Sequence, residues 1–334
     1  MGTSGGIMAH YQQKSTGFAL IGKGQSSFYS KDYVIAFRGT VSRSDISTDI
    51  RATGSVGDNG STVHAGFNTL FHTMKGELYA YFNHVRELST IHCVGHSLGG
   101  ALASLAADWF KYNFRHDIKL YTFGAPKVGY SNFALKTTNT LKQENIYRCC
   151  NGSDPIPMVP VWPFVHAPYN GYEYSFAAGA IMNPFAHKLS RYEKNAKSES
   201  WDDYPRKRSF NSYNRVRLKP ENSWQASPTM YWYVRLSEAL VTLIRDVRIG
   251  LLNSIQSGIA NGLNLYDQIA MVLSDVSFAT PSFNIQINGL LAHMLVFSGL
   301  AAVKITELSY EFIRWIFQKT LAVLNRVARQ ALSL

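Results

Sequence analysis

The sequence predicts an α/β fold with a mostly parallel, doubly wound sheet, followed by a helical region at the carboxyl end. Short β-prone runs alternate with helix-prone segments up to about residue 195, and this alternation is typical of parallel strands joined by helical crossovers. A glycine-flanked serine, Ser97, stands where one of these runs gives way to a helix. Beyond about Lys194 the composition becomes polar, and apolar residues then return at helical spacing.

Ser97 lies in the run CVGHSLGGALA at residues 93–103. The part GHSLG fits G-x-S-x-G, the pattern that places a nucleophilic serine on a sharp turn between a strand and a helix. The preceding residues are β-prone, and Gly100–Phe110 is alanine-rich and helix-prone. We expect Gly95 and Gly99 to be required because a Cβ at either position would collide with the opposing backbone.

Upstream of Ser97 the chain predicts two strands and a helix. Gly17–Ile21 is β-prone, and Tyr33–Phe37 is a continuous apolar run of the kind found in strands buried on both faces. Arg38-Gly39-Thr40 follows, and then a polar stretch at residues 41–62. Val63–Val85 carries apolar residues at helical spacing.

Downstream, strands are expected at Ile118–Phe123 and Asn145–Cys150, and Asp154 follows the second one closely. A nucleophilic serine needs a base, and the base needs an orienting acid. In sheets with a serine at such a turn, the acid and then the histidine follow along the chain. Asp154 is therefore the predicted acid.

Two histidines after Asp154 compete for the role of base. His166 lies between Pro163 and Pro168, and His187 begins the run HKLSRY. Residue type and chain order do not choose between them. His293 also follows, but its apolar surroundings favour a core histidine.

Five blocks of the chain carry a family resemblance: FRGT at 37–40, VHAGF at 63–67, GHSLGGALA at 95–103, TFGAPKVG at 122–129 and DPIP at 154–157. In this order they resemble the class 3 lipases, the fungal-lipase-like branch of the α/β hydrolases. The resemblance covers roughly residues 15–195 and implies an α/β-hydrolase fold. In that family the catalytic histidine precedes a Leu-x-x-Tyr-like block, which selects His187 over His166.

The resemblance also implies an oxyanion hole built from the main-chain N–H groups of Leu98 and Thr40. Arg38 is expected to be a structural ion-pair residue. Residues 41–62 occupy the place of the family's lid, where Ser44-Asp45 is expected to cap a short helix. Family lids often have tryptophan where Ile46 stands, so the sequence does not predict interfacial activation.

We divide the chain into a catalytic domain at residues 1–195, a polar linker or surface excursion at 196–229, and a helical region at 230–334. Gly289–Val303 is largely apolar but shorter than the roughly 18–20 residues of a spanning helix, which favours a buried helix. Glu311–Leu332 is a basic amphipathic segment, which can lie on a membrane or pack against its own domain.

Charge and cysteine content indicate partners and compartment. The net charge of +11 favours an anionic membrane surface, and no basic–aromatic motif indicates nucleic acid. Cys93, Cys149 and Cys150 give no disulfide framework, which indicates folding in a reducing compartment. The amino terminus has no apolar signal stretch, so we expect synthesis in the cytoplasm and export, if any, by a leaderless route. No cofactor is expected, and no ligand spacing indicates a metal.

These features predict a serine lipase or phospholipase that cleaves carboxyl esters through Ser97, His187 and Asp154. A basic, leaderless lipase resembles the phospholipase effectors that type VI secretion delivers into rival bacteria. That resemblance implies a phospholipid substrate, action at a target-cell membrane, and an immunity protein or secretion component as partner. Two alternatives stay open: an intracellular neutral-lipid lipase or esterase, and a membrane-disrupting or binding protein that acts through its C-terminal helices.

Overall fold

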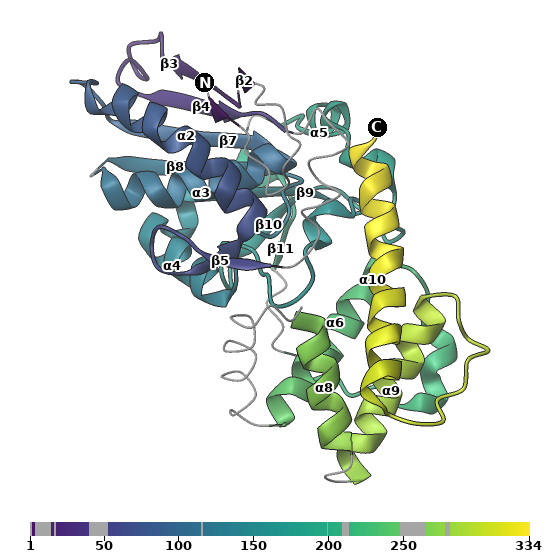
Figure 1. The fold of residues 1–334 in the computed structure, drawn as a ribbon. Coiled ribbons are helices and arrows are strands. Elements are labelled where there is room, and N and C mark those ends of the chain that lie inside the picture. Colours follow the sequence, from purple (N-terminus) through teal and green to yellow (C-terminus); the bar gives the residue numbers. More distant parts are fainter. Residues whose placement is uncertain are drawn as a thin grey trace. The chain divides into compact units, whose positions relative to one another are not determined.

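The computed structural model describes residues 2–3, 15–16, 18–39, 53–114, 116–198, 200–208, 214–247, 265–277 and 281–334. The chain divides into two compact units (Figure 1). The sheet unit comprises residues 1–178, 184–211 and 331–334, and the helical unit comprises residues 179–183 and 212–330.

The sheet unit is built on a seven-stranded sheet in the order β11-β10-β9-β8-β7-β4-β3. The central strands run parallel, and they are β4 (Tyr33–Phe37), β7 (Thr90–His96), β8 (Asp117–Phe123), β9 (Ile146–Asn151) and β10 (Tyr172–Ala177). At the two edges, β3 (Ala19–Lys23) and β11 (Arg206–Arg208) are antiparallel to their neighbours. The predicted mostly parallel α/β sheet is confirmed.

Three helices connect neighbouring parallel strands: α2 (Ala65–Asn83), α3 (Leu98–Asn113) and α4 (Ser131–Leu141). The parallel strands lie side by side in the order in which the chain forms them. Right-handed crossovers between such strands put all their helices on the same face, and α2, α3 and α4 lie on one face in Figure 1. The helices that connect these strands therefore lie on one face, and not on both faces as the connecting helices of a doubly wound sheet do.

The core of the sheet unit lies between this face and its helices. One buried row of side chains crosses four strands, with neighbours paired in register and 0–3% exposed: Ile35, Cys93, Leu120 and Ile146. In β4, however, Val34 is 42% exposed. The apolar run Tyr33–Phe37 therefore does not mark a strand buried on both faces, because α2 and α3 pack on the face that carries Ile35.

Short elements complete the sheet unit. β5 (Gly54–Val56) pairs with β6 (Thr62–His64), and β1 (Gly2–Thr3) pairs with β2 (Ser15–Thr16). The chain enters α2 directly from β6, where His64 Nδ1 accepts a hydrogen bond from the N–H of Phe67. The remaining elements are α5 (Leu189–Asn195) and the 3-10 helices η1 (Gln143–Asn145), η2 (Ile156–Met158), η3 (Pro184–His187) and η4 (Trp201–Asp203).

Part of the polar stretch 196–229 is built into these units. β11 pairs with β10 as an edge strand of the sheet, and Val216 and Leu218 are buried in the helical unit. These parts of the stretch are therefore not a free linker.

The helical unit consists of η5 (Pro220–Gln225), α6 (Met230–Asp246), α8 (Leu265–Ser277), α9 (Pro281–Phe297) and most of α10 (Tyr310–Leu332). The apolar side of α10 packs inside this unit. Ile313, Ile316 and Phe317 are at most 1% exposed, and the ring of Phe317 lies 6.1 Å from that of Tyr266 in α8. Of the two alternatives for this amphipathic segment, a helix on a membrane or a helix packed within the protein, the structure shows the packed helix.

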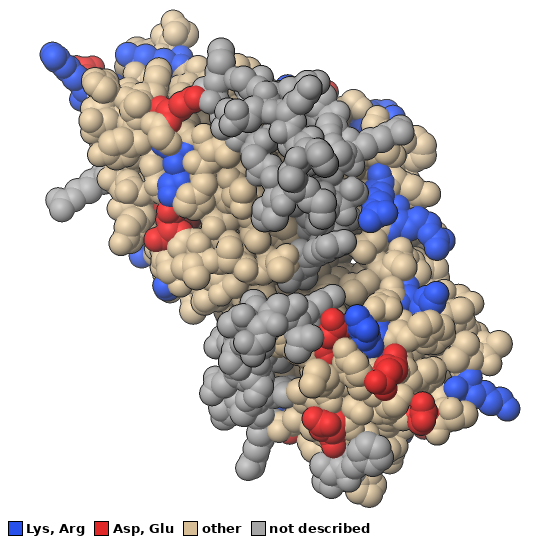
Figure 2. All heavy atoms as spheres, viewed as in Figure 1, with Lys and Arg blue, Asp and Glu red and all other residues tan. Residues whose placement is uncertain are grey.

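The helical unit shows mixed charge on its surface. Acidic side chains lie among the basic ones on the face drawn in Figure 2, and the Nε–H of Arg314 donates to Asp267 Oδ1 at 2.6 Å. His293 is buried in α9 and donates from Nδ1 to the carbonyl of Gly289, as expected of a core histidine. Within the described part of the chain, none of the helices combines the length and the apolar character needed to cross a bilayer.

Candidate active site

Ser97 alone forms the turn between β7, which ends at His96, and α3, which begins at Leu98. Its backbone has φ 56° and ψ −128°, and such a positive φ costs a non-glycine residue on the order of 1–3 kcal/mol. The strand, the strained turn and the helix follow one another as the sequence predicts.

The glycines on either side of Ser97 allow three segments of main chain to lie close together: the end of β7, the start of α3 and the end of β4. A Cβ on Gly95 would lie 2.1 Å from the carbonyl oxygen of Gly99, and a Cβ on Gly99 would lie 2.2 Å from that of Phe37. Both distances are far inside van der Waals contact. The expected collision with opposing backbone is thus present at both positions.

A hydrogen-bonded chain of three buried side chains starts at Ser97. Its Oγ–H donates to His187 Nε2 at 2.8 Å, and His187 Nδ1–H donates to Asp154 Oδ2 at 2.8 Å. Ser97, His187 and Asp154 are 5%, 3% and 0% exposed. His187 comes from η3 and Asp154 follows β9, so the fold brings together side chains that are far apart in sequence.

Further donors hold the Asp154 carboxylate. Oδ2 also accepts from the Tyr192 hydroxyl at 2.7 Å, and Oδ1 accepts from the N–H of Ile156 at 2.9 Å. The Tyr192 oxygen in turn accepts from the N–H of Asn151 at 3.1 Å. Burial, and then the negative charge of Asp154, raise the pKa of Tyr192 well above its ordinary value, which keeps the phenol protonated as a donor.

His96, inside the serine motif, supports the other side of His187. Its Nε2–H donates to the main-chain carbonyl of His187 at 2.7 Å, and the two rings stack with centroids 4.7 Å apart. Burial, and then the charge of His187, lower the pKa of His96 to about 4. A neutral His96 can stack against the imidazolium that a general base becomes without repelling it.

The competing histidine, His166, lies outside this hydrogen-bonded chain and fixes the loop behind Asp154. Its Nε2–H donates to the carbonyl of Pro157 at 2.7 Å, and Lys127 Nζ donates to that of Met158 at 3.0 Å. Burial, with Arg148 nearby, lowers the pKa of His166 well below its ordinary value and that of Lys127 to about 7. The two side chains therefore act on the main chain that follows Asp154.

Of the two predicted oxyanion donors, Leu98 lies within the described residues and Thr40 does not. Leu98 is the first residue of α3, so its N–H is one of those at a helix start that have no intrahelical acceptor. A Cβ on Gly39 would lie 3.7 Å from Ser97 Cβ, so the chain leaving β4 passes beside the serine. Thr40 lies outside the described residues, as do residues 41–52 of the predicted lid, including Ser44-Asp45 and Ile46.

Two residues of the site are not among those that the sequence predicts, although each has a local signal. Tyr192 closes the block that begins at His187, and His96 directly precedes the serine. The ion pair expected for Arg38 stays a prediction. In the described ranges, His, Cys, Asp and Glu side chains nowhere gather in threes as metal ligands would.

A parallel sheet with a strained serine after a central strand, and with a histidine and an aspartate hydrogen-bonded behind it, defines the class of α/β hydrolases. Residues 34–164 match the model of the family Lipase (class 3). This part of the chain is therefore similar to the class 3 lipases.

The chain is also similar to curated proteins and to a solved structure. The chain is 32% identical over 136 residues to secreted mono- and diacylglycerol lipase 1 of Fusarium solani, covering 39% of this chain and 40% of that protein. It is 28% identical over 235 residues to toxin TseL of Vibrio cholerae, covering 65% of this chain and 33% of the toxin. The solved structure of Rhizomucor miehei triacylglyceride lipase is 29% identical, with a TM-score of 0.40 over 47% of this chain and 61% of the lipase. The chain thus spans less than half the length of these two curated relatives.

Proposed function

We propose that the protein is a serine hydrolase that cleaves carboxyl esters of lipids, with Ser97, His187 and Asp154 as its catalytic triad. The observation that carries the proposal is the buried hydrogen-bonded chain from Ser97 through His187 to Asp154, with the serine in strained backbone. A structural serine has no need of that strain or of that orientation of a histidine.

In this mechanism His187 Nε2 takes the Ser97 proton while Oγ attacks the ester carbonyl carbon. Asp154 holds the tautomer with the proton on Nδ1 and stabilises the imidazolium. The N–H groups of Leu98 and Thr40 stabilise the tetrahedral oxyanion, each by roughly 3–4 kcal/mol. The intermediate expels the alcohol, which takes the proton from His187, and water activated by His187 then releases the fatty acid from Oγ.

Phospholipid is the proposed substrate. The net charge of +11 supports action at anionic membranes, and the similarity over 65% of the chain to a protein named a toxin supports action on a cell. A second candidate substrate, monoacylglycerol or diacylglycerol, is favoured by the 32% identity to a lipase of that specificity.

We further propose that the protein acts at the membrane of a target cell after secretion. The names of the relatives, a secreted lipase and a toxin, support this setting. In it, the producing cell would need an immunity protein, and a component of a secretion machine would carry the protein. Membrane contact would involve the helical unit.

The test is product analysis with the purified full chain. Phosphatidylglycerol–phosphatidylethanolamine vesicles and diacylglycerol emulsions are incubated with the protein, and mass spectrometry identifies the released acyl chains and lysolipids. Ser97→Ala and His187→Ala are expected to reduce turnover on the order of 10⁶-fold. His166→Ala is expected to retain most of the activity of the unsubstituted chain, provided that the variant is folded.

The outcomes distinguish between the two substrates and test the hydrolase proposal and the choice of base. Lysophospholipid and fatty acid support the phospholipid assignment, whereas activity confined to diacylglycerol selects the second candidate. Equal turnover by the unsubstituted chain and Ser97→Ala would refute the hydrolase proposal. Loss of activity in His166→Ala, with His187→Ala active, would refute the choice of base.

A further inference from the structure

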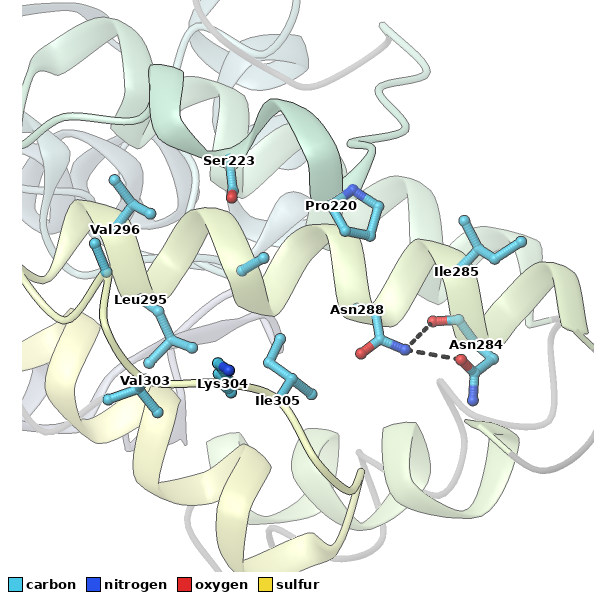
Figure 3. Close-up of a pocket in the computed structure, with 12 residues that line it drawn as sticks. Pro220, Ser223, Asn284, Ile285, Asn288, Leu295, Val296, Val303, Lys304 and Ile305 are labelled. Atoms are coloured by element: carbon cyan, nitrogen blue, oxygen red, sulfur yellow. Dashed lines mark hydrogen bonds between the residues drawn. The ribbon is translucent and has the colours of Figure 1, made fainter.

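The helical unit contains a groove of about 530 Å³, separate from the residues around Ser97. The groove runs along α9, with η5 on one side and the chain between α9 and α10 on the other (Figure 3). Its volume is in the range of pockets that hold one small organic ligand. No part of the proposed mechanism uses it.

Most of the groove wall is aliphatic. Ile285, Leu295 and Val296 line it from α9, and Val303 and Ile305 line it from the connecting chain. Ile285 is 57% exposed, so the apolar surface continues to the rim. Covering such a surface with a hydrocarbon chain removes apolar area from water on both partners.

One cation stands within this apolar wall. Lys304 lies between Val303 and Ile305 in the chain and is exposed, and it carries the only charge among the described residues that line the groove. The polar lining is otherwise neutral: Ser223 and the amides Asn284 and Asn288, with Asn288 Nδ2 donating to Asn284 Oδ1 at 2.7 Å. A long aliphatic surface with one ammonium group matches a ligand with one hydrocarbon chain and one anionic head.

We propose that this groove is a binding site for a single long-chain fatty acid, with the carboxylate at Lys304 and the hydrocarbon chain along α9. The lysine stem packs against the chain while its ammonium reaches the carboxylate at the rim. The source of the fatty acid is the ester hydrolysis proposed above, so this one step rests on the proposed function. The site then keeps the released product on the helical unit.

The test measures binding without turnover. The full chain carrying Ser97→Ala is incubated with a fatty acid that bears a mid-chain diazirine, irradiated and digested, and mass spectrometry locates the label. We expect labelled peptides from residues 284–305. Titration with unlabelled palmitate, by competition, gives the affinity.

Two variants and a control address the groove itself. Ala292→Trp places an indole in the groove, where Ala292 is part of the wall, and is expected to abolish labelling of residues 284–305. Lys304→Gln changes an exposed side chain and is expected to weaken palmitate binding roughly two- to fivefold, the range for one exposed ion pair. Lys319→Gln removes another exposed cation, on α10 and outside the groove, and is expected to change neither the labelling nor the affinity for palmitate.

The outcomes separate this proposal from the hydrolase proposal. Label confined to peptides around Ser97, or unchanged labelling in Ala292→Trp, overturns the fatty acid site. Equal effects of Lys304→Gln and Lys319→Gln overturn the role of Lys304, and a preference for two-chain anionic phospholipid over palmitate overturns the ligand. Because the binding assay uses added fatty acid and an inactive variant, its result does not depend on whether the unsubstituted chain hydrolyses esters.

Discussion

Acidification is expected to destabilise the sheet unit through His96. This ring stacks on His187 and donates to its main-chain carbonyl, and its pKa falls from an ordinary 6.5 to about 4. A base whose pKa is lower in the folded state contributes stability above the unfolded pKa and loses it as the pH falls toward the folded pKa. Between pH 7 and 5 the loss is at most about 1.4 kcal/mol per pH unit, and about 2 kcal/mol in all.

The matched variant is His96→Gln, which keeps an N–H donor for the His187 carbonyl but does not titrate. Other groups also change stability in this range. The lowered pKa of His166 acts in the same direction, and the pKa of Asp108, raised by burial to about 6, acts in the opposite one. Both are present in the variant, so the difference between the two chains isolates His96.

Thiol reactivity supplies a readout that belongs to the sheet unit. Cys93, Cys149 and Cys150 are the only cysteines of the chain, and all three are buried there. Their reaction with dithiodipyridine, which proceeds at acidic pH, is followed across urea titrations at pH 7 and pH 5. The unsubstituted chain should lose about 2 kcal/mol more than His96→Gln. The same pH dependence in both chains would refute the reasoning.

Three further predictions concern packing, the support of Asp154 and the membrane. Tyr192→Phe removes a donor to Asp154 and leaves a buried N–H without its acceptor. Urea titration should therefore show a free energy of unfolding lower by about 2–3 kcal/mol, and kcat on a soluble ester should fall. An unchanged kcat would contradict a positioning role for Tyr192. Gly99→Ala should lower the free energy of unfolding by about 3 kcal/mol or more. Gly76→Ala, whose Cβ meets open space, should stabilise α2 by about 0.5–1 kcal/mol. Equal melting temperatures of the two variants would contradict both predictions. The third prediction replaces three exposed cations of α10 with glutamine: Lys319, Arg326 and Arg329. Vesicle co-sedimentation should then show weaker binding to anionic lipid, by about 1 kcal/mol per charge. Unchanged binding would mean that these charges serve another role.

Much of the fold could be predicted because its signals are local. Alternating β-prone and helix-prone runs indicated the parallel strands, and the spacing of Gly95 and Gly99 around Ser97 reported a backbone contact that tolerates no Cβ. Asp154 was found because it comes directly after a strand end. Each of these inferences needs only a few adjacent residues.

The rest depends on contacts between distant segments. Residue types alone could not choose His187 over His166, since the choice is made by how the chain after β10 returns to Ser97. The apolar run of β4 could not reveal that Val34 is exposed, because the face covered by helices is set by crossover handedness across the whole sheet. Amphipathicity in α10 likewise could not distinguish a membrane face from the packed face that holds Ile316.

The strain at Ser97 persists because its surroundings are rigid. The Ser97 N–H donates to the carbonyl of Phe123 in β8, and its carbonyl accepts from Gly100, so the turn is tied to both sheet and helix. The helix α3 is buried at every residue from Leu98 to Phe110, which leaves it no room to shift and relax the turn. His187, by contrast, lies on a single turn of 3-10 helix held by side chains of the sheet, with Asn151 Nδ2 donating to Ala186 and His96 to His187 itself. The serine is thus fixed by backbone packing and the histidine by side-chain hydrogen bonds, so substitutions around η3 should disturb the geometry of the base before that of the nucleophile.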